Sequence, residues 1–179
     1  MTRLLKLNQA EMSSRQKEVY EVILSGPRGR VHGPLAIWLH RANLADKAQA
    51  LGQYCRYETS LPAHLSELAI LTTACIWDAK FEWHAHVSPA LAAGLDPAII
   101  DALAVDKPPM FNSSEEALVY EFTKELNLKR SVSDELYTRS VLILGDGGVV
   151  DLVGVLGYYS LISMTIKVFD IDPKDVEEE

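Results

Sequence analysis

The chain has 179 residues, of which 48% are hydrophobic and 23% are charged, which suits one folded domain and excludes a disordered chain. With 17 lysines and arginines against 25 aspartates and glutamates, its net charge of −8 argues against nucleic-acid binding, which depends on basic patches. Its two cysteines, Cys55 and Cys75, form no CxxC pair, which excludes a disulfide scaffold and a zinc ribbon. The first residues show no signal-peptide pattern, so we expect a reduced, cytoplasmic setting.

Hydrophobic periodicity predicts helices from the start of the chain. A first helix is expected over residues 13–25. Residues 26–34 then break regular structure, because three glycines and two prolines fall within this short segment. The helical pattern resumes at Leu35 and, after a capping sequence at 43–46, continues to Tyr57.

The second half of the chain is expected to be helical as well. A long helix is predicted from about His64 to Ala93, where Gly94 ends it. Three helices follow, one after Asp96-Pro97, one from Ser113 or Ser114 to about Leu128, and one from the capping sequence at 132–135 to about Leu144. A turn over 145–148 precedes the last helix. Because strand-like alternation is rare, we predict an all-α single domain over 1–179, with its core at about 15–172 and an acidic tail at 173–179.

The last apolar segment, Val149 to Phe169, has about the length that spans a bilayer. However, Asp151 and Lys167 lie inside it, together with several glycines and serines, and no polybasic flank orients it. We therefore expect no membrane span. A buried helix of a multi-helix or oligomeric core is the better interpretation.

The residues best suited to chemistry lie between Glu67 and His86. Glu82 and His86 are four residues apart, which places a carboxylate beside an imidazole on one helix face. Such a pair can perform acid/base catalysis if it is buried, as the apolar surroundings suggest. Glu67, a little over four helical turns earlier, is expected near the same face. The alternative is an exposed ion pair that contributes only about 0.2–0.5 kcal/mol to stability.

Two other features of the sequence bear on ligand binding. His84 and His86 point about 200° apart on a helix, so we expect no metal site. The glycine- and proline-rich segment carries Arg28, Arg30 and His32, and a rigid basic loop in an acidic protein suits a small anion. A solvated connector with incidental charges explains this loop equally well.

Several motifs follow one another in a fixed order: Glu67, then Phe81-Glu82-Trp83-His84-Ala85-His86, then Ala93-Gly94-Leu95. Further segments are those at 26–30, 38–39, 56–59, 149–154 and 157–159. Over about residues 15–172, these motifs resemble the carboxymuconolactone decarboxylase family, in a long-form subgroup. The resemblance implies an alkylhydroperoxidase D-like helical bundle that assembles as a homo-oligomer, either a trimer or a hexamer.

Peroxidases of that fold carry a CxxC pair, and the matching positions here are Ala79 and Glu82. Because that dithiol is missing, thiol-based peroxidase activity is not expected. The resemblance instead implies cofactor-free decarboxylation of a small carboxylated lactone or related carboxylic acid. As hypotheses, His86 donates the proton, Glu82 orients it or relays the proton, and Glu67 supports them. Substrate binding is assigned to Arg28, Arg30, His32, Tyr57 and Trp83.

This hypothesis predicts that His86→Ala abolishes turnover and leaves the melting temperature nearly unchanged. Two alternatives remain. The same pair of residues could isomerise or hydrolyse a lactone, because those reactions also need one positioned acid/base. The chain could also be a non-catalytic helical oligomer in which the pair only stabilises an interface.

Overall fold

The predicted all-α class is confirmed by the computed structural model, which describes residues 2–176 and contains no strand among them. Residues 177–179 of the predicted acidic tail lie outside the described residues. The helices are α1 (Ser14–Ser25), α2 (Gly33–Trp38), α3 (Ala42–Tyr57), α4 (Ala63–Trp77), α5 (Lys80–Ala92), α6 (Pro97–Ala104), α7 (Ser114–Lys129) and α8 (Asp134–Phe169). Short 3-10 turns are η1 (Gln9–Glu11), η2 (Leu39–Arg41) and η3 (Pro173–Val176).

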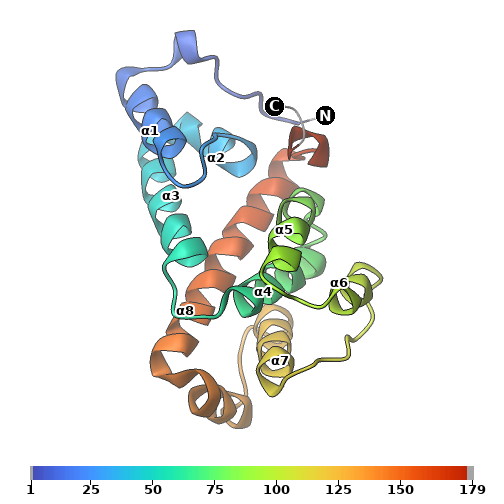
Figure 1. The fold of residues 1–179 in the computed structure, drawn as a ribbon. Coiled ribbons are helices and arrows are strands. Elements are labelled where there is room, and N and C mark those ends of the chain that lie inside the picture. Colours follow the sequence, from blue (N-terminus) through green and yellow to red (C-terminus); the bar gives the residue numbers. More distant parts are fainter. Residues whose placement is uncertain (1, 177–179) are drawn as a thin grey trace.

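Helix α8 is the centre of the fold. It runs through the molecule between α1, α2 and α3 on one side and α4 to α7 on the other (Figure 1) and contacts α2, α3, α4, α5 and α7. Most of its buried side chains are apolar or aromatic, such as Leu152, Val155, Tyr158 and Tyr159. By length and composition it is also the one described helix that could cross a membrane, and 39% of its apolar window is buried in the protein.

The outward faces of α3 and α8 carry exposed apolar side chains. Leu51 and Tyr54 on α3 are 48% and 42% exposed, and Val150 and Val153 on α8 are 70% and 47% exposed. An apolar face of this kind is what an oligomer would cover. The predicted homo-oligomer stays a prediction.

The helix predicted over 64–93 is in fact two helices, because the chain reverses at Asp78 and Ala79. Asp78 adopts a left-handed conformation with φ 48°. Lys167 of α8 holds it there, with Nζ 2.9 Å from the carboxylate and 3.2 Å from the carbonyl oxygen of Asp78. The N–H of Ala79 then donates to the carbonyl oxygen of Ala74 at 2.8 Å, which closes α4. Helices α4 and α5 therefore pack as a hairpin, and side chains on one can meet those on the other.

The turn predicted over 145–148 contains fewer non-helical residues than expected. Only Gly145 leaves the helical conformation, with φ 71° and ψ 168°, and the chain is helical again at once. This conformation requires glycine, because a Cβ would be strained there. The predicted helices on either side therefore join into one kinked element.

Candidate active site

The residues singled out by their spacing form a buried triad. His86 Nε2 lies 2.9 Å from Glu82 Oε1, one turn earlier on α5. His86 Nδ1 lies 2.7 Å from Glu67 Oε2, which comes from α4 across the hairpin. All three residues are buried: His86 is 2% exposed, Glu82 5% and Glu67 8%. The prediction that Glu67 shares a helix face with the pair was wrong, since the reversal at Asp78 brings it to the opposite side of the imidazole.

Two carboxylates on one imidazole change its protonation. Burial by itself lowers the pKa of His86, but the charges and hydrogen bonds of Glu82 and Glu67 outweigh burial and raise the pKa to about 9. At neutral pH the ring is therefore a cation held between two anions. Both ring nitrogens are already hydrogen-bonded, so the group that can exchange a proton with a ligand is Glu82.

Glu82 and His86 lie at one wall of a cavity of about 230 Å³. The cavity is built from the loop before α2, the end of α3, the first turns of α5 and the middle of α8. Its lining comprises Pro27, Arg28, Arg30, His32, Pro34, Leu35, Arg56, Tyr57, Phe81, Glu82, Ala85, His86, Tyr158, Tyr159 and Ile162. A space of this size fits a small organic molecule. Glu67 is absent from this lining and contacts the cavity only through His86.

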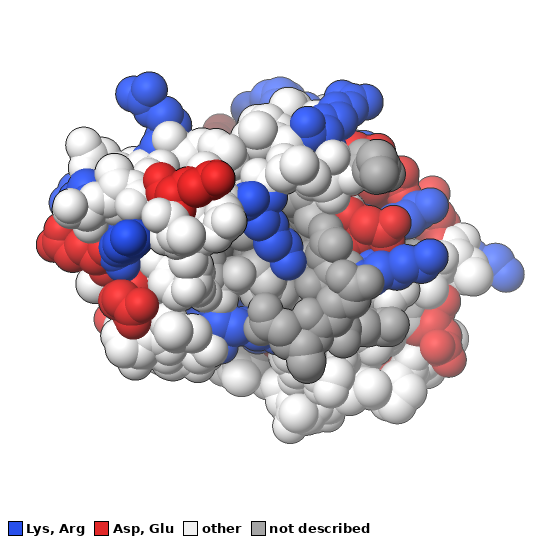
Figure 2. Space-filling view, turned by 90° about the horizontal axis from the view of Figure 1, so that it is seen from above, with Lys and Arg blue, Asp and Glu red and all other residues white. Residues whose placement is uncertain are grey.

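The cavity is electropositive. Three arginines, Arg28, Arg30 and Arg56, line it. Against them the triad carries one net negative charge, from two carboxylates and one imidazolium, which leaves an excess of about two positive charges. Over the face seen in Figure 2, basic and acidic side chains are interspersed. The excess positive charge is therefore a local property of the cavity, suited to a small anion.

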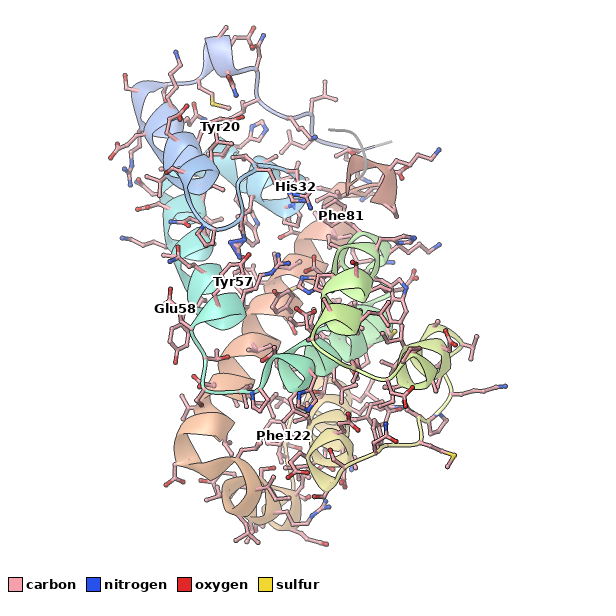
Figure 3. The ribbon with its side chains drawn as sticks, viewed as in Figure 1. Tyr20, His32, Tyr57, Glu58, Phe81 and Phe122 are labelled. Carbon is pink, nitrogen blue, oxygen red and sulfur yellow. The ribbon has the colours of Figure 1, made fainter. Side chains whose placement is uncertain are left out.

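His32 does not add to this charge. Its burial and the nearby charges of Arg30 and Lys6 lower its pKa to about 4, against the opposing effect of Glu82. The imidazole is therefore neutral at pH 7 and lies against Phe81, with ring centroids 5.7 Å apart (Figure 3). The prediction that His32 belongs to the site agrees with its place in the cavity lining. The prediction that His32 adds positive charge to this loop was wrong, because its surroundings keep the imidazole neutral.

Tyr158 and Arg28 meet at a glycine of α3. The Arg28 guanidinium donates to the Tyr158 hydroxyl at 3.4 Å. A Cβ added to Gly52 would overlap that hydroxyl and lie 2.6 Å from the guanidinium nitrogen. Gly52 therefore leaves the space in which the pair reaches the cavity.

We predict that Gly52→Ala displaces Tyr158 and Arg28 and destabilises the fold by about 1–3 kcal/mol, the usual cost of overpacking a buried site. Urea unfolding of the purified variant measures this. Gly157→Ala on α8 is the matched control, because nothing lies within 4 Å of its added Cβ. Equal stability of the two variants would contradict the prediction.

The structure brings together four of the five residues predicted to bind substrate. Arg28, Arg30, His32 and Tyr57 line the cavity, and Tyr57 projects from the end of α3 (Figure 3). Trp83 is elsewhere: it lines a groove on the other side of α5, because it follows Glu82 by one residue and so points about 100° away from it.

Three further residues of the cavity were not singled out from the sequence. Arg56, Tyr158 and Tyr159 lie in segments that entered only through the family resemblance. The tyrosine pair offered a signal, since tyrosines buried within an apolar helix such as α8 usually need a polar partner for their hydroxyls.

The two cysteines are poorly suited to redox chemistry. Burial raises the pKa of Cys55 to about 11 and that of Cys75 to about 12. Both are free thiols, and neither lines the cavity that holds His86. At neutral pH they are protonated, whereas peroxide attack requires a thiolate.

Comparisons with known proteins agree with the predicted resemblance. The model of the carboxymuconolactone decarboxylase family matches residues 42–125, which contain α3 to α6 and most of α7. A crystal structure of an uncharacterized peroxidase-related protein from Silicibacter sp. TM1040 is similar to this chain with a TM-score of 0.75. The two are 13% identical, and the match covers 96% of this chain and 91% of that one, which shows a shared fold. No match was found among curated proteins.

Proposed function

The chain carries the carboxymuconolactone decarboxylase family pattern over residues 42–125, and from this premise we propose that it is a cofactor-independent decarboxylase. Its substrate is a small carboxylated lactone or a related organic acid. The observation that carries the proposal is the His86 imidazolium, held between two carboxylates at the wall of a small electropositive cavity.

The cavity supplies what such a reaction needs. Arg28 and Arg30 bind the anionic substrate through its carboxylate or lactone oxygen, and Tyr57 forms part of the cavity wall. The bond to the carboxylate breaks and releases carbon dioxide. The electron pair moves into the unsaturated carbonyl system of the ring, so the substrate itself is the electron sink.

The proton that completes the reaction comes from the triad. Glu82 delivers a proton to the substrate carbon and takes one from His86 Nε2, which lies 2.9 Å away. Glu67 fixes the ring through Nδ1 and stabilises its positive charge. Solvent returns the proton after product leaves.

A thiol peroxidase is the less favoured function of this fold. The cysteines at 55 and 75 are protonated at neutral pH and do not line the cavity, and Glu82 stands where the resemblance would place a redox cysteine. The word peroxidase in the description of the similar crystal structure applies to that protein.

We predict that Glu82→Gln lowers the turnover number at least about 10²-fold, because the amide cannot pass a proton to the substrate. The assay is release of carbon dioxide from 4-carboxymuconolactone and a panel of smaller carboxylated lactones. Glu21→Gln, an exposed position on α1, is the control and should retain full activity.

Two results would count against this function. Undiminished turnover in Glu82→Gln would remove Glu82 from the proton path. A wild-type protein that consumes a lactone without releasing carbon dioxide would be an isomerase or hydrolase instead.

A further inference from the structure

Tyr159 is a buried aromatic residue of the cavity and has no role in the steps above. It is 2% exposed. Its ring stands edge-on to His86, with centroids 5.1 Å apart and an interplanar angle of 89°. It makes a second perpendicular contact, at 5.3 Å, with Tyr158. Contacts on two sides fix the ring, so its hydroxyl has a defined position beside the triad.

The hydroxyl of Tyr159 makes no hydrogen bond to any described residue, although a buried tyrosine usually finds a partner. The hydroxyl oxygen of Tyr159 is nevertheless accessible to solvent. The solvent-inaccessible side-chain polar atoms of the described residues that lack a hydrogen-bond partner belong to His32, Thr72, Trp77, Thr123 and Ser163. The Tyr159 oxygen therefore opens into the cavity that its side chain lines.

The two neighbouring tyrosines differ in this respect. The Tyr158 hydroxyl accepts a hydrogen bond from Arg28 and so is engaged within the protein. The Tyr159 hydroxyl has no such partner among the described residues, so its O–H donor and its oxygen are both open to a ligand. The arginines carry full charges that attract an anion, whereas Tyr159 offers a neutral, directional O–H donor at greater depth.

This hydroxyl stays protonated. Burial and the negative charge of Glu82 raise the pKa of Tyr159 well above its ordinary value, and the charge of Arg56 opposes them only in part. A hydroxyl that cannot ionise at neutral pH is a permanent hydrogen-bond donor.

We infer that Tyr159 is a catalytic residue that donates its O–H to the enolate oxygen formed on the ring carbonyl when carbon dioxide leaves. This inference rests on the proposed function. No proton is transferred by Tyr159: the electron pair from the broken bond resides on the carbonyl oxygen, and the O–H stabilises it until Glu82 protonates the carbon. Such preorganised donors stabilise a transition state because they are already oriented toward the charge that develops.

The test compares Tyr159→Phe with wild type in binding and in turnover. The probe is tetronate, the stable enolate of a five-membered lactone, and the matched probe is 2(5H)-furanone, a neutral lactone of the same ring size. Calorimetry should show tetronate binding weakened at least about tenfold in the variant, as for loss of a hydrogen bond to a charged oxygen. Furanone binding should change less than about twofold, since it carries no developed charge.

The turnover number for carbon dioxide release should fall about 10²–10³-fold with little change in KM. Tyr137→Phe, an exposed position on α8 outside the cavity, should match wild type in every measurement. Equal tetronate affinity in wild type and Tyr159→Phe would overturn the role of Tyr159 and leave the proposed function standing. A wild-type protein that binds neither probe and releases no carbon dioxide would overturn the proposed function, and the inference with it.

Discussion

His86→Ala should abolish turnover and also lower the free energy of unfolding by about 3 kcal/mol or more. The substitution leaves Glu67 and Glu82 buried without the cation between them, and removing one partner of a buried ionic cluster typically costs about 3–5 kcal/mol. This revises the expectation from sequence that the melting temperature would hardly change. In the structure two buried carboxylates contact the imidazole, and both would lose their cation in the variant.

Urea unfolding at pH 7 measures the loss. His84→Ala is the matched control, because it makes the same substitution on the same helix at an exposed position. The control should stay within about 0.5 kcal/mol of wild type, as surface substitutions usually do. An unfolding midpoint for His86→Ala equal to that of His84→Ala would show that the triad does not contribute to stability.

How far the sequence predicts this site depends on how local each contact is. The pairing of Glu82 with His86 follows from their spacing alone, because four residues along a helix fix the neighbourhood of two side chains. The place of Glu67 does not follow, because it depends on one residue, Asp78, adopting a left-handed conformation between two apolar helical stretches. Nothing in the apolar pattern marks this reversal, since Trp77 and Phe81 keep the four-residue spacing of a helix across it.

The same distinction explains the rest of the cavity. Arg28, Arg30 and His32 share one short loop, so their gathering was predictable from sequence. The neutral state of His32 was not, because it depends on burial against Phe81 and on charges from other segments. Tyr159 reaches the triad only through the packing of α8 on α5, more than seventy residues apart in the chain, and one sequence contains no such information.

Stability should fall as pH rises from about 6.5 to about 9, by about 3 kcal/mol. The folded pKa of His86 is about 9 and the ordinary value is 6.5. The folded protein therefore holds a proton that the unfolded chain releases, and each unit of pKa difference is worth about 1.4 kcal/mol. The contribution is fully present below pH 6.5 and is lost as pH rises through 9.

Other groups act outside this window. The raised pKa values of Cys55 and Cys75 reduce stability only above the ordinary thiol value of 9.0, where the unfolded thiols ionise first. The pKa of His32 is lowered to about 4, so this residue reduces stability only as pH falls below 6.5. In that range the histidine is protonated in the unfolded chain but stays neutral in the folded protein. Urea unfolding between pH 6.5 and 9 thus isolates His86. His86→Gln should remove most of the slope there, and a wild-type curve that is flat across this range would mean that the imidazole is not held as a cation.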